Sequence, residues 1–186
     1  MISRIAAGLS ATAFAIFTSG TVAQPNNATH IPTEEIMTVF QNLGETIDQQ
    51  IRVVDIGDDI NVAVGILRRA GARTEGEEVT AIVHHRVTEV YYVLEGSGIL
   101  VTGGDESNAL EFPADNSSVL ILIGPSGRRT VVNGQEQTIK PGDIVVIPAG
   151  VPHGFRHIQD QVTYLSVRVD PDQTLPTGYA HPSIAE

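Results

Sequence analysis

The sequence predicts an all-β protein, an antiparallel sandwich or barrel with one short helix in front of it. Segments rich in valine and isoleucine recur from residue 51 to residue 170, and clusters of glycine, proline, asparagine and aspartate separate them. Many short strands with such turn residues between them are typical of antiparallel folds. The length of 186 residues and the lack of an internal repeat favour a single domain.

Eight apolar segments are the candidate strands of this domain. They are IRVVDI (51–56), INVAVGILRR (60–69), VTAIVHH (79–85), VYYVLEGSGILVTGG (90–104), SVLILIG (118–124), RTVVNGQEQTIK (129–140), DIVVIPAG (143–150) and QVTYLSVRV (161–169). We expect a hairpin at Asn133-Gly134, because this dipeptide favours tight two-residue turns. Residues 105–118 are expected to form a loop insertion, and residues 171–186 a C-terminal tail.

The segment from residue 24 to residue 50 is predicted to be a lead-in with one short helix. Thr33 is the expected N-cap, and two glutamates follow it in the first turn, where they favour the helix dipole. One apolar face is formed by Ile36, Val39 and Phe40. Gly44 is a plausible end of the helix, so we expect this short element to pack against the outside of the domain.

The first 23 residues have the pattern of an export signal. Arg4 precedes an alanine-rich apolar run that is shorter than the ~20 residues of a membrane span. Small residues then lead to Ala23, after which we expect cleavage. The mature protein is therefore predicted to be secreted or periplasmic, without a stable membrane anchor. Asn27 and Asn116 lie in Asn-x-Ser/Thr patterns, which we interpret as chance matches.

The charge of the chain excludes one class of function. The sequence has 22 acidic residues, 11 basic residues and a formal net charge of −11, and its arginines are scattered. Nucleic-acid binding requires a basic surface that neutralises phosphates. We therefore expect a small molecule, and no nucleic acid, as the partner.

The stretch HHRVTE, residues 84–89, carries a histidine and a glutamate that are candidate metal ligands. On one flat strand His84 and Glu89 would face opposite sides, because side chains alternate with a period of two. If Arg86-Val87-Thr88 is a bend between two strands, both side chains can point into the interior.

The stretch PGDIVVIPAGVPHGF, residues 141–155, is predicted to direct a second histidine inward. Its first three residues form a turn, residues 144–147 a strand, and residues 148–152 a rigid corner before His153. Two prolines and a glycine around one histidine fix its direction at low entropic cost.

Both stretches resemble the motifs of the cupin superfamily. The first motif is G-x5-H-x-H-x(3,4)-E-x6-G, and its spacing is matched by His84, Glu89 and Gly96. The second motif is G-x5-P-x-G-x2-H-x3-N, and its spacing is matched by Gly142, Pro148, Gly150 and His153, with His157 in place of the asparagine. The resemblance covers roughly residues 50–170 and implies a small antiparallel, jelly-roll-like β-barrel that holds one divalent metal ion.

The resemblance implies an incomplete set of metal ligands. Ile82 stands where the first histidine of the first motif would be, so His84, Glu89 and His153 remain. Two histidines and a carboxylate with open positions are typical of non-haem Fe(II) sites, and Mn, Zn and Ni also accept such a set. His85 is the alternative ligand, but neighbouring strand residues face opposite ways, and the shared parity of Ile82 with His84 favours the latter.

Further residues are assigned by strand parity. His157 has the parity of His153 and is the candidate acid/base near the metal. The candidate pocket wall consists of Ile82, Tyr91, Val93 and Phe155, which could equally be core residues.

These features suggest a secreted metalloenzyme that acts on a small oxygen-containing molecule, as a dioxygenase, decarboxylase, isomerase or lyase. The alternative is a non-catalytic cupin that captures a sugar or organic acid, with or without metal. Many cupins pair, so the resemblance also implies a homodimer as a candidate assembly. Substrate and metal identity are not fixed by the sequence.

Overall fold

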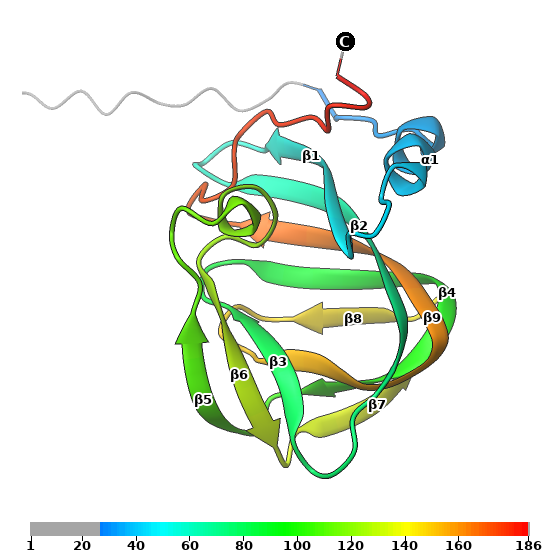
Figure 1. Ribbon diagram of the computed structural model, residues 1–186. Coiled ribbons are helices and arrows are strands. Elements are labelled where there is room, and N and C mark those ends of the chain that lie inside the picture. Colours follow the sequence, from blue (N-terminus) through cyan, green and yellow to red (C-terminus); the bar gives the residue numbers. More distant parts are fainter. Residues whose placement is uncertain (1–26, 186) are drawn as a thin grey trace, which may run out of the picture.

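The computed structural model describes residues 27–185, and the predicted export signal lies outside them. In residues 27–185, nine strands dominate the fold, together with one α-helix and one short π-helix (Figure 1). In chain order the elements are α1 (Thr33–Gln41), β1 (Asp48–Asp55), β2 (Asn61–Arg73), β3 (Val79–His84), β4 (Thr88–Thr102), β5 (Asp105–Glu111), η1 (Val119–Ile123), β6 (Ser126–Val132), β7 (Gln135–Ile139), β8 (Ile144–Ile147) and β9 (His153–Asp170). Within residues 27–185, no helix is long and apolar enough to cross a membrane.

All strand pairs are antiparallel and belong to one sheet that folds over itself. The strand order is β1-β2-β9-β3-β6-β5, and β4 pairs with β7, β8 and β9. The long strand β9 therefore connects the front strands of Figure 1 with the β4-β7-β8 layer behind them. The strand path ends at β1 and β5, so the sheet is jelly-roll-like and does not close into a continuous ring. The predicted all-β fold is confirmed.

The main core lies between these layers and is built by alternating residues of the two long strands. Tyr91 and Val93 of β4 pack with Val162 and Tyr164 of β9, and all four are at most 2% exposed. Gly96 lets the two strands approach closely. Its φ is +73°, and a Cβ at this position would lie 1.9 Å from the carbonyl oxygen of Gln161.

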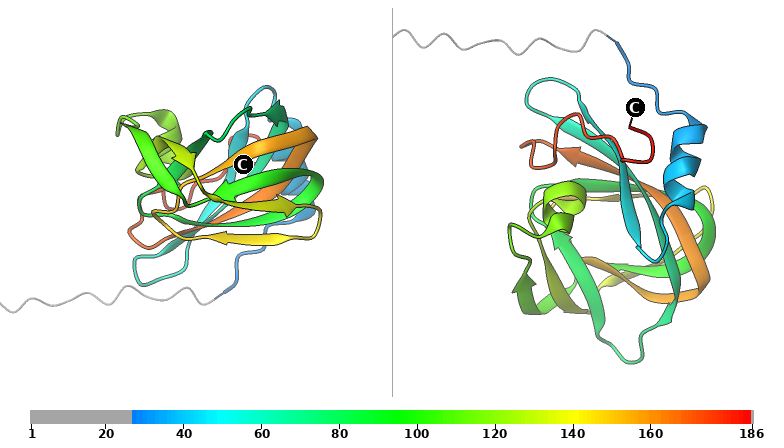
Figure 2. Two further views of the ribbon diagram at one scale, coloured as in Figure 1. Left: turned by 90° about the horizontal axis from the view of Figure 1, so that it is seen from below. Right: turned by 45° about the horizontal axis from the view of Figure 1, so that its top comes forward.

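Helix α1 covers the outer face of β1 and β2 (Figure 2). Val39, with Ile36 and Phe40 beside it, packs against Ile51 and Ile66, which confirms the predicted apolar face. The predicted cap is wrong. The N-cap residue is Pro32, whose carbonyl oxygen accepts hydrogen bonds from the first-turn amides, and Thr33 is already helical.

The C-terminal tail crosses over β1 instead of leaving the body (Figure 2). Leu175 is 1% exposed and packs with Val53 and Ala63, and Ala180 forms a β-bridge with Arg52.

Two segments differ from the expected secondary structure. Residues 105–111 are not part of a loop but form β5, an edge strand of exposed residues whose polar sequence has no apolar alternation to reveal it. Residues 119–123 are not a strand but the π-helix η1, which buries Val119 and Ile123 and leaves Leu120 52% exposed. A short run that is apolar at every position has no period, so it cannot distinguish a strand from a helical turn.

The Asn133-Gly134 turn is present, but the predicted hairpin is wrong. Strand β6 pairs with β3 and β5, whereas β7 pairs with β4. Asn133 adopts a φ of +56° and donates a hydrogen bond from Nδ2 to Asp105 Oδ2 at 2.9 Å. The turn therefore carries the chain from one layer to the other.

Candidate metal centre

Backbone hydrogen bonds join the two motif segments. Strand β3 ends at His84, and a bend leads into β4 at Thr88, as predicted. The amide of Gly150 donates to the carbonyl oxygen of His84 at 2.7 Å, and the amide of Ala149 donates to Thr88 Oγ1 at 3.2 Å. The proline-rich corner before β9 is thereby fixed on the bend between β3 and β4.

His84, Glu89 and His153 meet in the interior, and one ligand atom from each lies within 4.8 Å of the others. Glu89 Oε2 is 3.3 Å from His84 Nε2 and 3.2 Å from His153 Nε2. All three side chains are buried, with at most 5% exposed. The structure thus brings together the three residues that the sequence selected.

The outer nitrogen of each imidazole is occupied by a hydrogen bond that sets the tautomer. His153 Nδ1 lies 3.1 Å from the carbonyl oxygen of Val151, which can only accept, so Nδ1 carries the proton. His84 Nδ1 lies 2.8 Å from Ser126 Oγ. The single hydroxyl hydrogen of Ser126 is directed at the carbonyl oxygens of Ile123 and Gly124, so Oγ accepts from His84. Both Nε2 atoms are left as lone pairs that face Glu89.

A buried arginine, Arg168, binds the carboxylate oxygen of Glu89 that faces away from the histidines. Arg168 Nε donates to Glu89 Oε1 at 3.0 Å, and Ser166 Oγ donates to the same oxygen at 2.8 Å. The remaining guanidinium nitrogens bind Gln50 Oε1 at 2.8 Å and Asp48 Oδ2 at 2.5 Å. Glu89 Oε1 is therefore fully engaged, and Oε2 is the oxygen directed at the histidines.

Strand β2 gives Arg168 its space through a glycine. A Cβ on Gly65 would lie 2.8 Å from Arg168 Nη1 and 3.1 Å from the carbonyl oxygen of Gln49. A larger residue would have to displace the guanidinium, and with it the support of Glu89.

The protonation states follow from burial and from the neighbouring charges. Burial lowers the pKa of His84 and outweighs the opposing effect of Glu89, which favours a neutral imidazole. Burial alone would raise the pKa of Glu89, but His84 and His153 in their protonated forms, together with Arg168, hold the pKa of this carboxyl well below its ordinary value. With neutral imidazoles, Arg168 is the cation that keeps the carboxyl ionised. Burial also raises the pKa of Tyr91, so its hydroxyl stays protonated and donates to Glu89 Oε2 at 3.0 Å.

This donor set fits a divalent metal ion. His153 Nε2 is buried and has no hydrogen-bond partner among the described residues. Metal-bound histidines use one nitrogen as ligand and donate the other N–H to an oxygen, which is the arrangement of both His84 and His153. The cluster could therefore hold one ion, whose identity the three ligands leave open.

His85 is not part of the cluster. Its side chain faces outward, and its Nε2 lies 2.6 Å from Glu111 Oε2, a carboxylate that is 57% exposed. The alternation that favoured His84 over His85 thus describes the end of β3 correctly.

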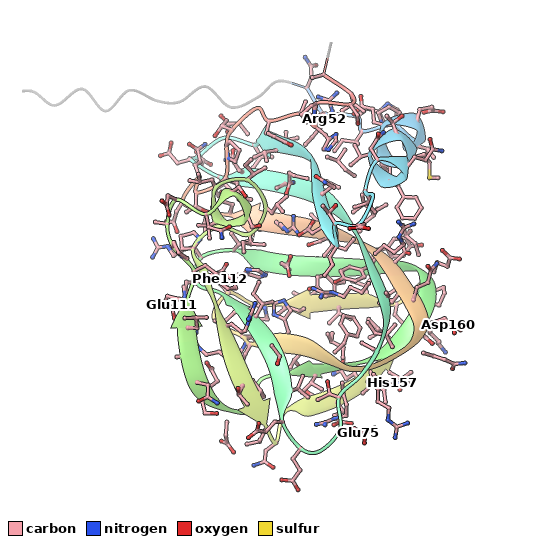
Figure 3. All side chains as sticks on the ribbon, in the orientation of Figure 1. Arg52, Glu75, Glu111, Phe112, His157 and Asp160 are labelled. Atoms are coloured by element: carbon pink, nitrogen blue, oxygen red, sulfur yellow. The ribbon has the colours of Figure 1, made fainter. Side chains whose placement is uncertain are left out.

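His157 lies away from the cluster, so the parity argument that placed it there is wrong. On β4, Ile99 pairs with His157 and the next residue, Leu100, pairs with Phe155, which leaves Arg156 as an extra residue in a β-bulge. Beyond this bulge the core residue is Ile158, so His157 faces the other way. In the view of Figure 3, His157 lies at the lower right near Glu75, and Phe112 lies at the left.

The predicted wall residues divide between the cavity and the core. Ile82 and Tyr91 line a cavity of about 390 Å³ that contains the cluster. Phe155 lines an adjoining cavity of about 450 Å³, which also reaches Ile82 and His153. Val93 belongs to the hydrophobic core and lines neither cavity.

Five residues that support the ligands were not predicted from the sequence. These are Asp48, Gln50, Ser126, Ser166 and Arg168. One signal was present in β9, where the inward positions Val162, Tyr164, Ser166 and Arg168 change from apolar to polar as the strand passes the cluster. A charged residue at a core position is buried only when it has partners, so Arg168 could have been recognised as part of a site.

The comparison with protein families agrees with the second motif. The sequence profile of the cupin domain matches residues 119–168. No significant match was found among curated proteins. Among solved structures, the chain is similar to a protein from Bacillus halodurans, with 16% identity, a TM-score of 0.44, and coverage of 86% of this chain and 93% of that one.

The chain is also similar to two further solved structures. The DMSP lyase DddQ from Ruegeria pomeroyi DSS-3 has 15% identity, a TM-score of 0.38, and coverage of 75% of this chain and 54% of that one. KdgF from Halomonas sp. has 16% identity, a TM-score of 0.37, and coverage of 68% of this chain and 83% of that one.

The matched segment contains the whole second motif, from Gly142 to His153. The first motif lies before it, and the fold brings the two together at one buried cluster. The chain is thus similar to the cupin domain over residues 119–168, the segment that carries the second motif.

Proposed function

We propose that the protein is a divalent-metal-dependent cupin enzyme that acts on a small oxygen-containing molecule. His84, Glu89 and His153 are the proposed ligands, and Fe, Mn, Zn or Ni the candidate ions. We further propose that it works outside the cytoplasm, after removal of a leader that ends near Ala23.

The observation that carries the proposal is the unpaired Nε2 of His153. A buried polar atom without a partner is costly, and most such atoms in native proteins have one. This lone pair lies 3.2 Å from Glu89 Oε2, the oxygen that also lies 3.3 Å from His84 Nε2, and the opposite nitrogen of His153 is already bonded. A cation shared by these atoms would satisfy all of them.

The residues around the cluster suit a reaction site that is open on one side. A bound divalent ion would supply Lewis-acid polarisation of a substrate oxygen. Ile82 stands at the position of a fourth ligand and lines the cavity, so it leaves room for a substrate. The Tyr91 hydroxyl donates a hydrogen bond to Glu89 Oε2 with an oxygen–oxygen distance of 3.0 Å, and Arg168 fixes the glutamate in place.

Elemental analysis of the natively purified protein tests the metal assignment. We expect about one divalent ion per chain in the wild type and strongly reduced metal content in His84→Ala and His153→Ala, because each removes a ligand. His85→Ala and His157→Ala are matched controls that remove an imidazole outside the cluster, and they should keep the metal.

A metal-free wild type, or ligand variants that retain as much metal as the two controls, would overturn the assignment. Assays with a panel of candidate substrates distinguish an enzyme from a binding module. An enzyme would form product, whereas a binding module would be stabilised by a ligand without forming product.

A further inference from the structure

The two cavities beside the cluster form one continuous space. They share several lining residues, among them Ile82 and His153, which pair directly across β3 and β9. Two arginines, Arg69 and Arg128, also line both cavities. They are the cationic side chains of this space that are not committed to Glu89 or Asp48.

Contacts with two aromatic residues fix the guanidinium of Arg69, and its terminal nitrogens form no hydrogen bond within residues 27–185. Its Nε donates to Tyr164 Oη at 2.9 Å, and its guanidinium lies 5.7 Å from the ring centre of Phe155. Within residues 27–185, its two Nη atoms have no hydrogen-bond acceptor and no carboxylate within ion-pair distance. Two aromatic residues thus hold a guanidinium group that belongs to the lining of both cavities.

Arg128 lies in the same row of residues as a proposed metal ligand. On neighbouring strands, Arg128 of β6 pairs with Ile82 of β3, and Ile82 pairs with His153 of β9. Paired residues share a face of the sheet, and neighbouring strands are about 5 Å apart, so Arg128 is about 10 Å from His153 along this row. Its guanidinium lies 6.0 Å from the ring centre of Phe112, and no carboxylate of the described chain pairs with it.

Each of these arginines has an arginine neighbour on the other face of its strand. Arg68 faces helix α1, where its guanidinium lies 5.2 Å from the ring centre of Phe40. Arg129 is neutralised by Glu106 at 3.1 Å and Glu111 at 2.6 Å. Arg129 thus has carboxylate partners, whereas Arg69 and Arg128 have aromatic contacts but no carboxylate partner within residues 27–185.

The charges of the cavity therefore favour an anion. The acidic side chains that line it, Asp48 and Glu89, are both bound by Arg168. Three guanidinium groups, those of Arg69, Arg128 and Arg168, therefore face two carboxylates, which leaves the lining with one excess positive charge in a chain whose net charge is −11. A divalent ion at the cluster would increase this excess.

We propose that the substrate of this centre is a small organic carboxylate whose anionic group is bound by Arg69 and Arg128 beside the metal cluster. The planar guanidinium fork matches a carboxylate in two parallel hydrogen bonds. Apolar side chains such as Ile82, Phe112 and Phe155 form the walls around the two arginines. An apolar body with one planar anionic group fits these walls better than a compact, hydrated oxyanion. The assignment as a substrate rests on the proposed function, but the anion site itself does not require the metal.

Titration calorimetry with a panel of simple probes tests this proposal. Acetate, butyrate and benzoate are compared with acetamide, butyramide and benzamide, which have the same shape without the charge, and with inorganic phosphate. We expect carboxylates to bind more tightly than their amides, and the larger apolar bodies to bind best. Hydrogen bonds to a charged group contribute about 1.5–3 kcal/mol, so Arg69→Gln and Arg128→Gln should each weaken binding roughly 10- to 100-fold.

Arg68→Gln and Arg129→Gln are the matched controls and should leave carboxylate affinity unchanged. All four variants should keep the wild-type metal content, because none removes a ligand. The proposal is overturned if no carboxylate binds, if amides or phosphate bind as tightly as the best carboxylate, or if the outer variants lose as much affinity as the inner ones.

The experiment also separates this proposal from the proposed function. Arginine-dependent carboxylate binding by a protein without metal would leave the anion site standing and remove the metalloenzyme. A metal-loaded protein that binds carboxylates independently of Arg69 and Arg128 would remove the anion site alone.

Discussion

The inner and outer faces of strands β3 and β6 carry the same residue types in opposite surroundings. His84 faces the buried cluster, and its neighbour His85 binds the exposed Glu111. Arg128 faces the cavity without a carboxylate partner, and its neighbour Arg129 binds Glu106 and Glu111. On the outer face, the charged side chains form ion pairs that are accessible to solvent. On the inner face, the neighbouring residues hold each side chain in place but leave part of it available to a ligand in the cavity. The site is therefore identified by the face of the strand on which a residue lies, and residue type alone does not identify it.

The largest difference between the two faces is expected for Arg168→Met. The change would leave Glu89 and Asp48 buried without their shared cation, and breaking a buried ion pair costs about 3–5 kcal/mol. Chemical denaturation of the metal-free protein measures this loss of unfolding free energy. Arg168→Lys keeps the positive charge but cannot bind Glu89, Gln50 and Asp48 together. Its unfolding free energy should therefore lie between those of Arg168→Met and the wild type.

Arg86→Met is the outer counterpart. Arg86 pairs with Asp172 at 2.6 Å, but the two side chains are 56% and 39% exposed. Exposed ion pairs contribute at most about 1 kcal/mol, so this variant should remain close to the wild type. Equal destabilisation by Arg86→Met and Arg168→Met would contradict the distinction between the faces.

The sequence was sufficient where strands are regular. The spacing of His84 and Glu89 required a bend, and the bend at residues 85–87 turns both side chains inward. Alternation also selected His84 over His85, because no residue is inserted between Ile82 and the end of β3.

The same reasoning failed where pairing is irregular. The extra residue Arg156 reverses the parity of His157, and a single sequence gives no sign of a bulge at that point. Pairing partners far apart in the chain were also beyond reach. Ser126 is 42 residues from His84, and Asp48 is 120 residues from Arg168, so neither contact follows from local spacing.

A smaller effect is expected at the support of His84. Ser126→Ala removes the acceptor of the Nδ1–H, which fixes the tautomer with a free Nε2. Loss of such a supporting hydrogen bond typically weakens metal affinity about 10- to 100-fold. Competition titration with Zn²⁺ and Mn²⁺ measures this change. Ser107→Ala removes an exposed hydroxyl of β5 and is the control. Equal metal affinities of Ser126→Ala and Ser107→Ala would contradict the assigned tautomer of His84.

The smallest effect is expected for Arg129→Gln on the outer face. Its carboxylate partners, Glu106 and Glu111, are 39% and 57% exposed, so water and ions compete for these pairs. We expect a slight decrease in stability at low ionic strength. The decrease should shrink in concentrated salt, because the screening length falls from ~10 Å at 0.1 M to ~3 Å at 1 M. Thermal unfolding at both salt concentrations provides the measurement. A decrease as large as that of Arg168→Met and insensitive to salt would mean that the outer charges stabilise the fold as much as the inner ones. The difference between the two faces would then not identify the site.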